Sequence, residues 1–196
     1  ELIAQSKSQQ DAVLTDVNTL NDNLGFLRGK LSEYGASFDP DDYKTLVNKR
    51  SRAVFEYTKT TTGDIDFAWP VSPSRGISAY YLDSSYKAAF GVPHHAIDIR
   101  VPQKTSLRAT EDGIVYRAKD NGMGYSYIIL AHKGGFMTVY GHVYEIKVEE
   151  GDIIHKGDLI GLSGGMPGTK GAGYMTTGPH LHFEVLQNGV HKDPLD

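Results

Sequence analysis

Two histidines stand two residues apart in the segment 178–185, which reads GPHLHFEV. Successive side chains of an extended strand point to opposite faces, so His180, His182 and Glu184 share one face, whereas the apolar residues between and after them share the other. Imidazole nitrogens are common metal ligands. The pattern therefore predicts a strand with one face that packs into a core and one face that can bind a metal ion.

A second candidate segment, residues 93–101, reads PHHAIDIRV. The same alternation places His94 and Asp98 on one face and the isoleucines and valine on the other. At about 3.3 Å per residue, an ideal strand would hold these two side chains roughly 13 Å apart, too far for one ion. We therefore expect His94 to lie in a loop after Pro93 that bends back toward Asp98. His95 is an alternative ligand, but the spacing and the facing of the side chains favour His94.

Two histidines and one carboxylate drawn from these segments suit zinc. Catalytic zinc sites take three protein ligands and keep a fourth position for water. The chain has no cysteine, which excludes disulfides and thiolate ligands, so any zinc must be held by nitrogen and oxygen.

Three motifs together resemble a known family. They are HxxxD at His94 and Asp98, Tyr-Gly-His at residues 140–142, and TGPHLHFEV at residues 177–185. In this order they are similar to the motifs of the lysostaphin and LytM type zinc peptidases, the M23 peptidase family, and the resemblance covers about residues 66–196. The chain departs from the family pattern where Ala96 replaces a usual glycine.

The resemblance assigns roles to five residues. It implies that His94, Asp98 and His182 bind Zn2+, and that His142 and His180 stand beside the metal as catalytic histidines. The glutamate base of an HExxH helix is absent. A neutral imidazole can accept a proton from water, and a protonated one can stabilise an oxyanion, so both duties are assigned jointly to His142 and His180.

The remaining polar candidates have structural interpretations. Glu184 could hold a ligand histidine, but a partly exposed strand carboxylate is the favoured interpretation. We expect His132 to be a hydrogen-bonded residue of a sheet, and His155 and His191 to be solvated in turn and tail segments.

From Asp64 onward, short strands alternate with glycine turns, and no strand–helix–strand alternation appears. The prediction is a mainly β fold, an antiparallel sheet or sandwich that forms the LytM-like catalytic domain over residues 64–196. Within the expected strand 136–144, Thr138, Tyr140 and His142 share a face. The expected strands after the His94 segment are 106–110, 113–118, 125–132, 136–144, 147–148, 159–163 and 181–186.

Residues 1–63 read as an N-terminal α-helical coiled-coil hairpin. Apolar residues recur at heptad spacing up to Tyr34, and Asp39-Pro40 is a typical start for a second helix of roughly 15 residues. A plain helix pair that packs on the next domain explains the pattern equally well. The heptad positions are Val13, Val17, Leu20, Leu24, Leu27, Leu31 and Tyr34.

Composition limits the possible partners and locations. The net charge of −4 gives no basic footprint for nucleic acid. No apolar run approaches the roughly 18 residues of a transmembrane helix. Because the chain starts at Glu1 without methionine, we interpret it as a fragment whose missing part could hold a signal or anchor.

The resemblance implies a zinc endopeptidase that cuts peptide stems or cross-links of bacterial peptidoglycan, in the periplasm or outside the cell. It also implies membrane anchoring of the full-length protein, with the N-terminal helices as a tether or as a contact for a regulatory partner. An alternative is a non-catalytic LytM-like scaffold that activates a cell-wall amidase. Such scaffolds have lost metal ligands, whereas this chain keeps the full set.

Overall fold

The computed structural model describes residues 65–174 and 176–196. The predicted coiled-coil hairpin and its boundary at residue 63 lie outside these residues. Within the described part, no helix has the length and apolar character needed to cross a membrane.

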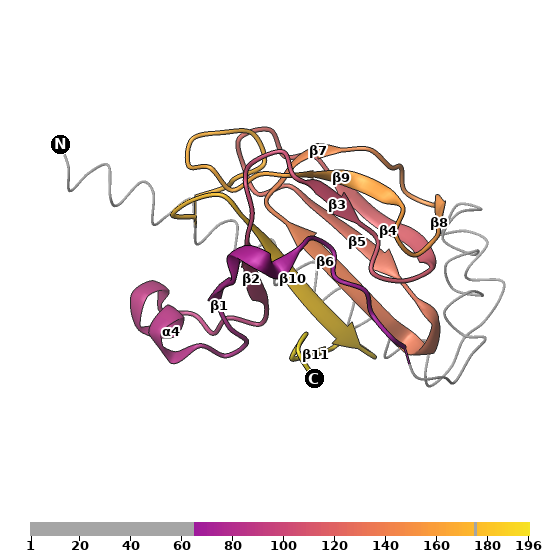
Figure 1. The fold of residues 1–196 in the computed structure, drawn as a ribbon, viewed down its shortest axis with the longest axis horizontal. Coiled ribbons are helices and arrows are strands. Elements are labelled where there is room, and N and C mark those ends of the chain that lie inside the picture. The colour runs from indigo at the N-terminus through magenta and orange to yellow at the C-terminus, as the bar shows by residue number, and fades with distance from the viewer. Residues whose placement is uncertain (1–64, 175) are drawn as a thin grey trace, which may run out of the picture.

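A large antiparallel sheet forms the body of the fold (Figure 1). Its long central strands meet edge to edge, so chain segments far apart in sequence become neighbours. The strand order is β1 (Ile77–Ala79), β2 (Ile97–Arg100), β10 (His180–Gln187), β6 (Phe136–Gly141), β5 (Tyr127–Ala131), β4 (Gly113–Lys119) and β8 (Ile153–Ile154), with β11 (Val190–Lys192) paired to β10.

A second sheet lies across one face of the first (Figure 1). It contains β3 (Ser106–Arg108), β9 (Leu159–Ser163) and β7 (Val143–Ile146), and its pairings are also antiparallel. The helical elements of the described residues are short: α4 (Ser84–Phe90) and the 3-10 turns η1 (Pro73–Arg75) and η2 (Lys133–Gly135). The predicted mainly β, antiparallel architecture is confirmed.

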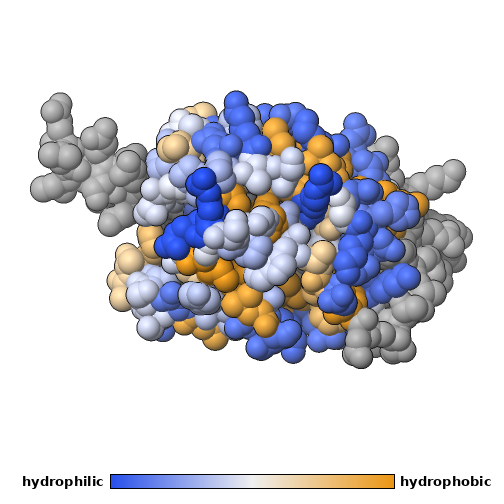
Figure 2. Space-filling view, viewed as in Figure 1, coloured by the Kyte–Doolittle hydropathy of each residue, from blue (hydrophilic) through white to orange (hydrophobic). Residues whose placement is uncertain are grey.

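The main core confirms the alternation of side chains. Leu181 and Phe183 of β10 and Ile99 of β2 are buried in one cluster with Leu107 and Ile160 from the smaller sheet. Because alternate residues face opposite ways, the second face of β2 and β10 is left for polar side chains. On the outer surface, hydrophilic and hydrophobic residues are interspersed over the face seen in Figure 2.

The strand expected over residues 136–144 is instead two strands in different sheets. Tyr140 is fully buried in the core, and simple alternation would send His142 to the same side. His142 has a φ of 55°, a left-handed conformation that is unusual for a residue other than glycine. The chain turns there from β6 into β7, and the His142 ring lies against His180. The prediction that Tyr140 and His142 share a face is therefore wrong.

His132 is a buried, hydrogen-bonded residue of the sheet, as predicted. Its Nδ1 donates to the Asp112 carbonyl at 2.9 Å, and its Nε2 accepts from the Thr138 hydroxyl at 2.8 Å. Burial lowers the pKa of His132 below its ordinary value of 6.5, although the Asp112 carbonyl opposes the shift. The ring is therefore neutral in the folded protein at neutral pH.

We expect His132 to make the fold sensitive to acid. The unfolded chain takes up a proton near pH 6.5, whereas the buried ring resists it, so stability that is present above this pH is lost as the pH falls. Urea unfolding at pH 7.5, 6.5 and 5.5, with a chelator present, measures how the free energy of unfolding changes with pH. His132→Gln should be less stable at pH 7.5 and should lose less stability on acidification. If the free energy of unfolding depends equally on pH in the wild type and in His132→Gln, His132 is not the source of the acid sensitivity.

Candidate active site

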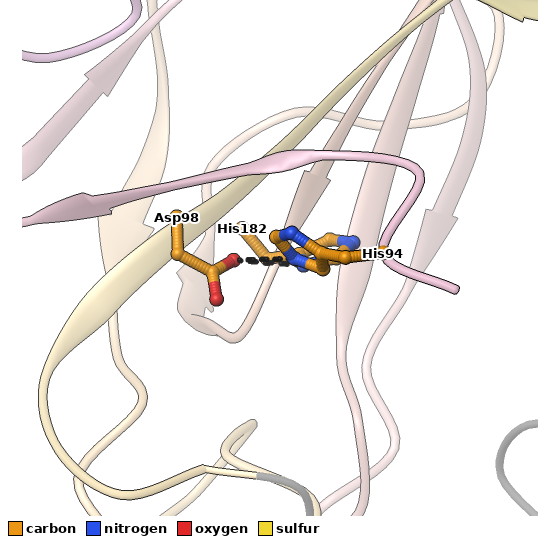
Figure 3. A group of neighbouring side chains, drawn as sticks. All are labelled: His94, Asp98 and His182. Atoms are coloured by element: carbon orange, nitrogen blue, oxygen red, sulfur yellow. Dashed lines mark hydrogen bonds and ion pairs between the residues drawn. The ribbon is translucent and has the colours of Figure 1, made fainter. Parts of the chain in front are cut away.

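The three predicted metal ligands converge on the face of the large sheet that points away from the smaller sheet. Asp98 and His182 are directly opposite each other in the pairing of β2 with β10. Asp98 Oδ1 lies 3.0 Å from His182 Nδ1 and 3.2 Å from His94 Nε2, and these two nitrogens are 3.4 Å apart. Figure 3 shows the three side chains pointing toward one another.

These distances fit a tetrahedral metal ion. Ligands at about 2.0–2.1 Å from zinc lie roughly 3.3 Å from each other in a tetrahedron. One donor atom from each of His94, Asp98 and His182 lies within 4.8 Å of the others. Two nitrogens and one carboxylate oxygen also match the donor set of catalytic zinc sites. The residues present therefore fit the ion that the sequence predicts.

His94 lies in the loop before β2, as predicted, and two contacts orient its ring. Its Nδ1 donates to the Tyr80 carbonyl at 2.9 Å, which leaves Nε2 free to bind a metal. The Tyr86 ring stacks on it at 4.2 Å between centroids. Tyr86 belongs to α4, whose first turn is capped by the Asp83 carboxylate. A short helix without buried residues thus positions one of the predicted ligands.

Glu184 orients His182, which overturns the favoured interpretation of an exposed carboxylate. Only 2% of Glu184 is exposed, and its Oε1 accepts from His182 Nε2 at 3.2 Å. Its Oε2 accepts from His191 Nε2 at 2.7 Å. His191 is buried rather than solvated, so that prediction is also wrong, and the reason is that β11 folds back beside β10. The hydrogen bond to Glu184 leaves His182 Nδ1 as the nitrogen that could bind a metal.

The charges of this cluster are mutually stabilised. Burial alone would raise the pKa of Glu184, but hydrogen bonds from His182 and His191 lower it to about 2. Burial would likewise lower the pKa of His182, but hydrogen bonds to Asp98 and Glu184 raise it to about 10. For Asp98, burial is outweighed by hydrogen bonds from His182 and His94, which lower its pKa. Both carboxylates are thus ionised, as a site for a divalent cation requires, and His182 must lose its Nδ1 proton for that nitrogen to bind the ion.

We expect Glu184→Gln to lower zinc affinity by about 10- to 100-fold, because a neutral amide holds the His182 ring less firmly and makes its nitrogen less basic. Competition between the protein and a chromophoric chelator measures the affinity. Glu145→Gln is the matched control, since Glu145 bonds to Lys147 on the surface. Unchanged zinc affinity in Glu184→Gln would show that Glu184 has only a structural role.

The two predicted catalytic histidines lie side by side next to the metal ligands. Their ring centroids are 4.5 Å apart, and the His142 and His182 centroids are 6.0 Å apart. His142 Nδ1 donates to the Ala172 carbonyl at 2.7 Å, and His180 Nδ1 donates to the Gly178 carbonyl at 2.8 Å. In both rings the backbone bond fixes the proton on Nδ1, so each Nε2 has a free lone pair.

Both rings are neutral at neutral pH. Burial, together with the nearby His180 and His182, lowers the pKa of His142 well below 6.5. Burial also lowers the pKa of His180, although Asp98 opposes the shift. Neutral imidazoles with a free Nε2 are suited to accept a proton.

Tyr125 belongs to the site but was not singled out from the sequence. Its ring makes edge contacts with His142, at 5.0 Å between centroids, and with His182 at 6.2 Å. Burial raises the pKa of Tyr125 well above 10, so the hydroxyl keeps its proton. In the described residues, the buried side-chain polar atoms that lack a hydrogen-bond partner are Tyr125 Oη and His180 Nε2. Such atoms cost about 1–3 kcal/mol each, and here both border the metal cluster.

The alternative ligand, His95, lies outside the cluster. Its ring packs beside His191 at 4.6 Å and Tyr81 at 6.1 Å between centroids. It is therefore His94, and not His95, that lies with Asp98 and His182. Ala96, which replaces the family's usual glycine, is fully buried.

The two-layer antiparallel fold brings together a His-Asp-His cluster that could hold a metal ion and two adjacent neutral histidines. A family model described as Peptidase family M23 matches residues 92–194, more than half of the chain. The chain belongs to this family, as its motifs predicted. The matched region contains all five predicted site residues.

Relatives and solved structures agree with this assignment. Peptidoglycan DD-endopeptidase ShyC of Vibrio cholerae is 34% identical over 101 residues, which are 52% of this chain and 22% of that relative. ShyA of the same organism, also a peptidoglycan DD-endopeptidase, is 32% identical over 97 residues, 50% of this chain and 21% of its own. A zinc-containing peptidase from Vibrio cholerae has a similar structure, with a TM-score of 0.58 and 28% identity over 68% of this chain and 40% of that one. This chain thus matches only a part of each.

Proposed function

We propose that this protein is a zinc-dependent endopeptidase that hydrolyses peptide stems or cross-links of bacterial peptidoglycan. The observation that carries the proposal is the cluster of His94, Asp98 and His182, with its donor atoms 3.0–3.4 Å apart, beside two neutral histidines. The names of the relatives support a DD-endopeptidase, which would cut a bond between D-configured residues at a cross-link.

The chain's own residues supply binding and proton transfer. Zinc, when bound, lowers the pKa of a water molecule and polarises a scissile carbonyl. His142 and His180 hold their protons on Nδ1, so one Nε2 accepts the proton of the attacking water. That ring, once protonated, stabilises the developing oxyanion or passes the same proton to the leaving amine. Tyr125, protonated and lacking a partner, is a further donor beside these rings.

Such an enzyme works where its substrate is. We therefore propose a cell-envelope location, periplasmic or extracellular, with peptidoglycan peptide as partner. Membrane anchoring and a regulatory partner for residues 1–63 remain proposals from the sequence. The complete set of ligands argues against the amidase-activating scaffold.

The proposal is tested by digesting purified peptidoglycan with the protein. We expect mass spectrometry to show new amino termini at peptide cross-links, loss of activity with a chelator, and recovery on adding zinc. Cleavage between the sugar and the stem peptide, or no products with zinc present, would contradict it. Activation of a separate amidase by metal-free protein would favour the scaffold.

A further inference from the structure

A pocket of about 600 Å3 adjoins the metal cluster, and His180 forms part of its wall. The other polar side chains that line it are those of Arg75, Ser78, Arg100 and Thr177. No acidic residue lines it. Because His180 Nε2 lies 3.7 Å from Asp98 Oδ2 of the cluster, a molecule in the pocket would be next to the bond undergoing hydrolysis.

Arg100 is fixed at the edge of this pocket. It lies directly opposite His180 in the pairing of β2 with β10, and opposed residues of antiparallel strands share a face. Its Nη1 donates to the Ile77 carbonyl at 3.0 Å, and its main-chain N–H donates to the Gly76 carbonyl at 3.0 Å. The guanidinium has further N–H groups in a planar fork, which are available to an anion.

Arg75 brings a second positive charge to the same pocket. It ends η1, and Gly76, with a φ of 80°, turns the chain from there into β1. Over residues 65–174 and 176–196, neither Arg75 nor Arg100 forms an ion pair with a carboxylate. Two guanidinium groups in one pocket without an acidic neighbour favour a negatively charged ligand.

We propose that this pocket binds a free carboxylate of the peptide substrate, with Arg100 as the principal contact and Arg75 as an additional charge. The inference rests on the proposed function and defines its substrate class as an acidic stem peptide. Arginine binds a carboxylate through parallel N–H···O bonds, which fix orientation as well as charge. Seating the carboxylate beside His180 places the neighbouring peptide bond at the metal cluster.

Binding is the first test, and it does not require hydrolysis. Calorimetry compares a linear, uncleavable stem peptide with its carboxylate-amidated form on the zinc-loaded chain. We expect amidation to weaken binding to the wild type by about tenfold, a value that allows for the exposure of Arg100. Arg100→Gln should weaken binding of the free acid by a similar factor and leave the amidated peptide unchanged. Arg117→Gln, which removes an exposed arginine paired with Glu150, should change neither.

Kinetics with a cross-linked peptide is the second test. We expect Arg100→Gln to raise KM for the free acid about tenfold while kcat stays within about twofold. Arg100→Lys should raise KM less than Arg100→Gln does, because lysine keeps the charge but lacks the planar fork. Thermal unfolding of each variant separates these effects from loss of folding.

Three outcomes would overturn the inference. Wild-type protein that binds or cleaves both peptides equally well lacks a carboxylate site. The pocket also lacks a carboxylate site if Arg100→Gln weakens the binding of the free-acid and the amidated peptide equally. Inorganic phosphate that binds the pocket more tightly than the free-acid peptide would assign it to a phosphate-bearing ligand. If the wild type prefers the free acid but cleaves no peptide, the proposed function fails and the carboxylate site stands.

Discussion

His182→Ala is expected to abolish both zinc binding and hydrolysis. The substitution removes the Nδ1 ligand that lies 3.0 Å from Asp98 Oδ1, and it leaves the Glu184 carboxylate buried without one of its two partners. Replacing a residue that hydrogen-bonds to a metal ligand already lowers metal affinity by about 10- to 100-fold, so losing a ligand should lower it more. Zinc content after dialysis and the rate of peptidoglycan digestion measure the two effects.

The control for this prediction is His155→Ala. The His155 side chain is 76% exposed, as the sequence predicted, and it lies outside the metal cluster. The His155→Ala variant should keep one zinc per chain and full activity. Because an unpaired Glu184 also threatens the fold, thermal unfolding in the presence of a chelator should be compared with that of the wild type. A His182→Ala protein that is folded and still holds stoichiometric zinc would disprove the proposed ligand set.

His142→Ala is expected to separate metal binding from catalysis. The His142 ring is held by the Ala172 carbonyl and by contacts with other rings, and it lies outside the cluster of donor atoms. We therefore expect zinc content to be unchanged. Loss of a general acid–base group should lower kcat by about 100- to 10,000-fold. Single-turnover digestion with zinc-saturated protein measures this loss.

His180→Ala gives the informative comparison. Its Nε2 lies 3.7 Å from Asp98 Oδ2, closer to the metal ligands, and His180 also lines the arginine pocket. If His142 accepts the proton and His180 stabilises the oxyanion, His142→Ala and His180→Ala should show different pH–rate profiles. Loss of zinc from His142→Ala would make it a ligand and would contradict its assignment to proton transfer.

The cluster is precise because it depends on strand register. Asp98 and His182 are paired across β2 and β10, and a shift of one residue would turn one of them into the core. The apolar alternates, among them Ile97, Leu181 and Phe183, are buried and oppose such a shift. The packing of the core thereby holds the ligand atoms at metal-binding distance.

The sequence by itself determined the two faces of β2 and β10 and the antiparallel β class, and it predicted the candidate ligand set. Alternation has a period of two residues, so a short segment is enough to show which side chains share a face. The need for a loop at His94 also followed from local geometry alone, because a straight strand could not bring His94 to Asp98.

Only the tertiary structure decided the rest of the site. The left-handed backbone at His142 turns its side chain to the face opposite the one that alternation assigns. The neighbouring residues do not predict this turn. Glu184 is buried because His191 returns beside it on β11, and Tyr125 reaches the histidines across the sheet. These contacts join residues that are distant in the chain or depend on a single dihedral angle, so they arise only when the strands are assembled.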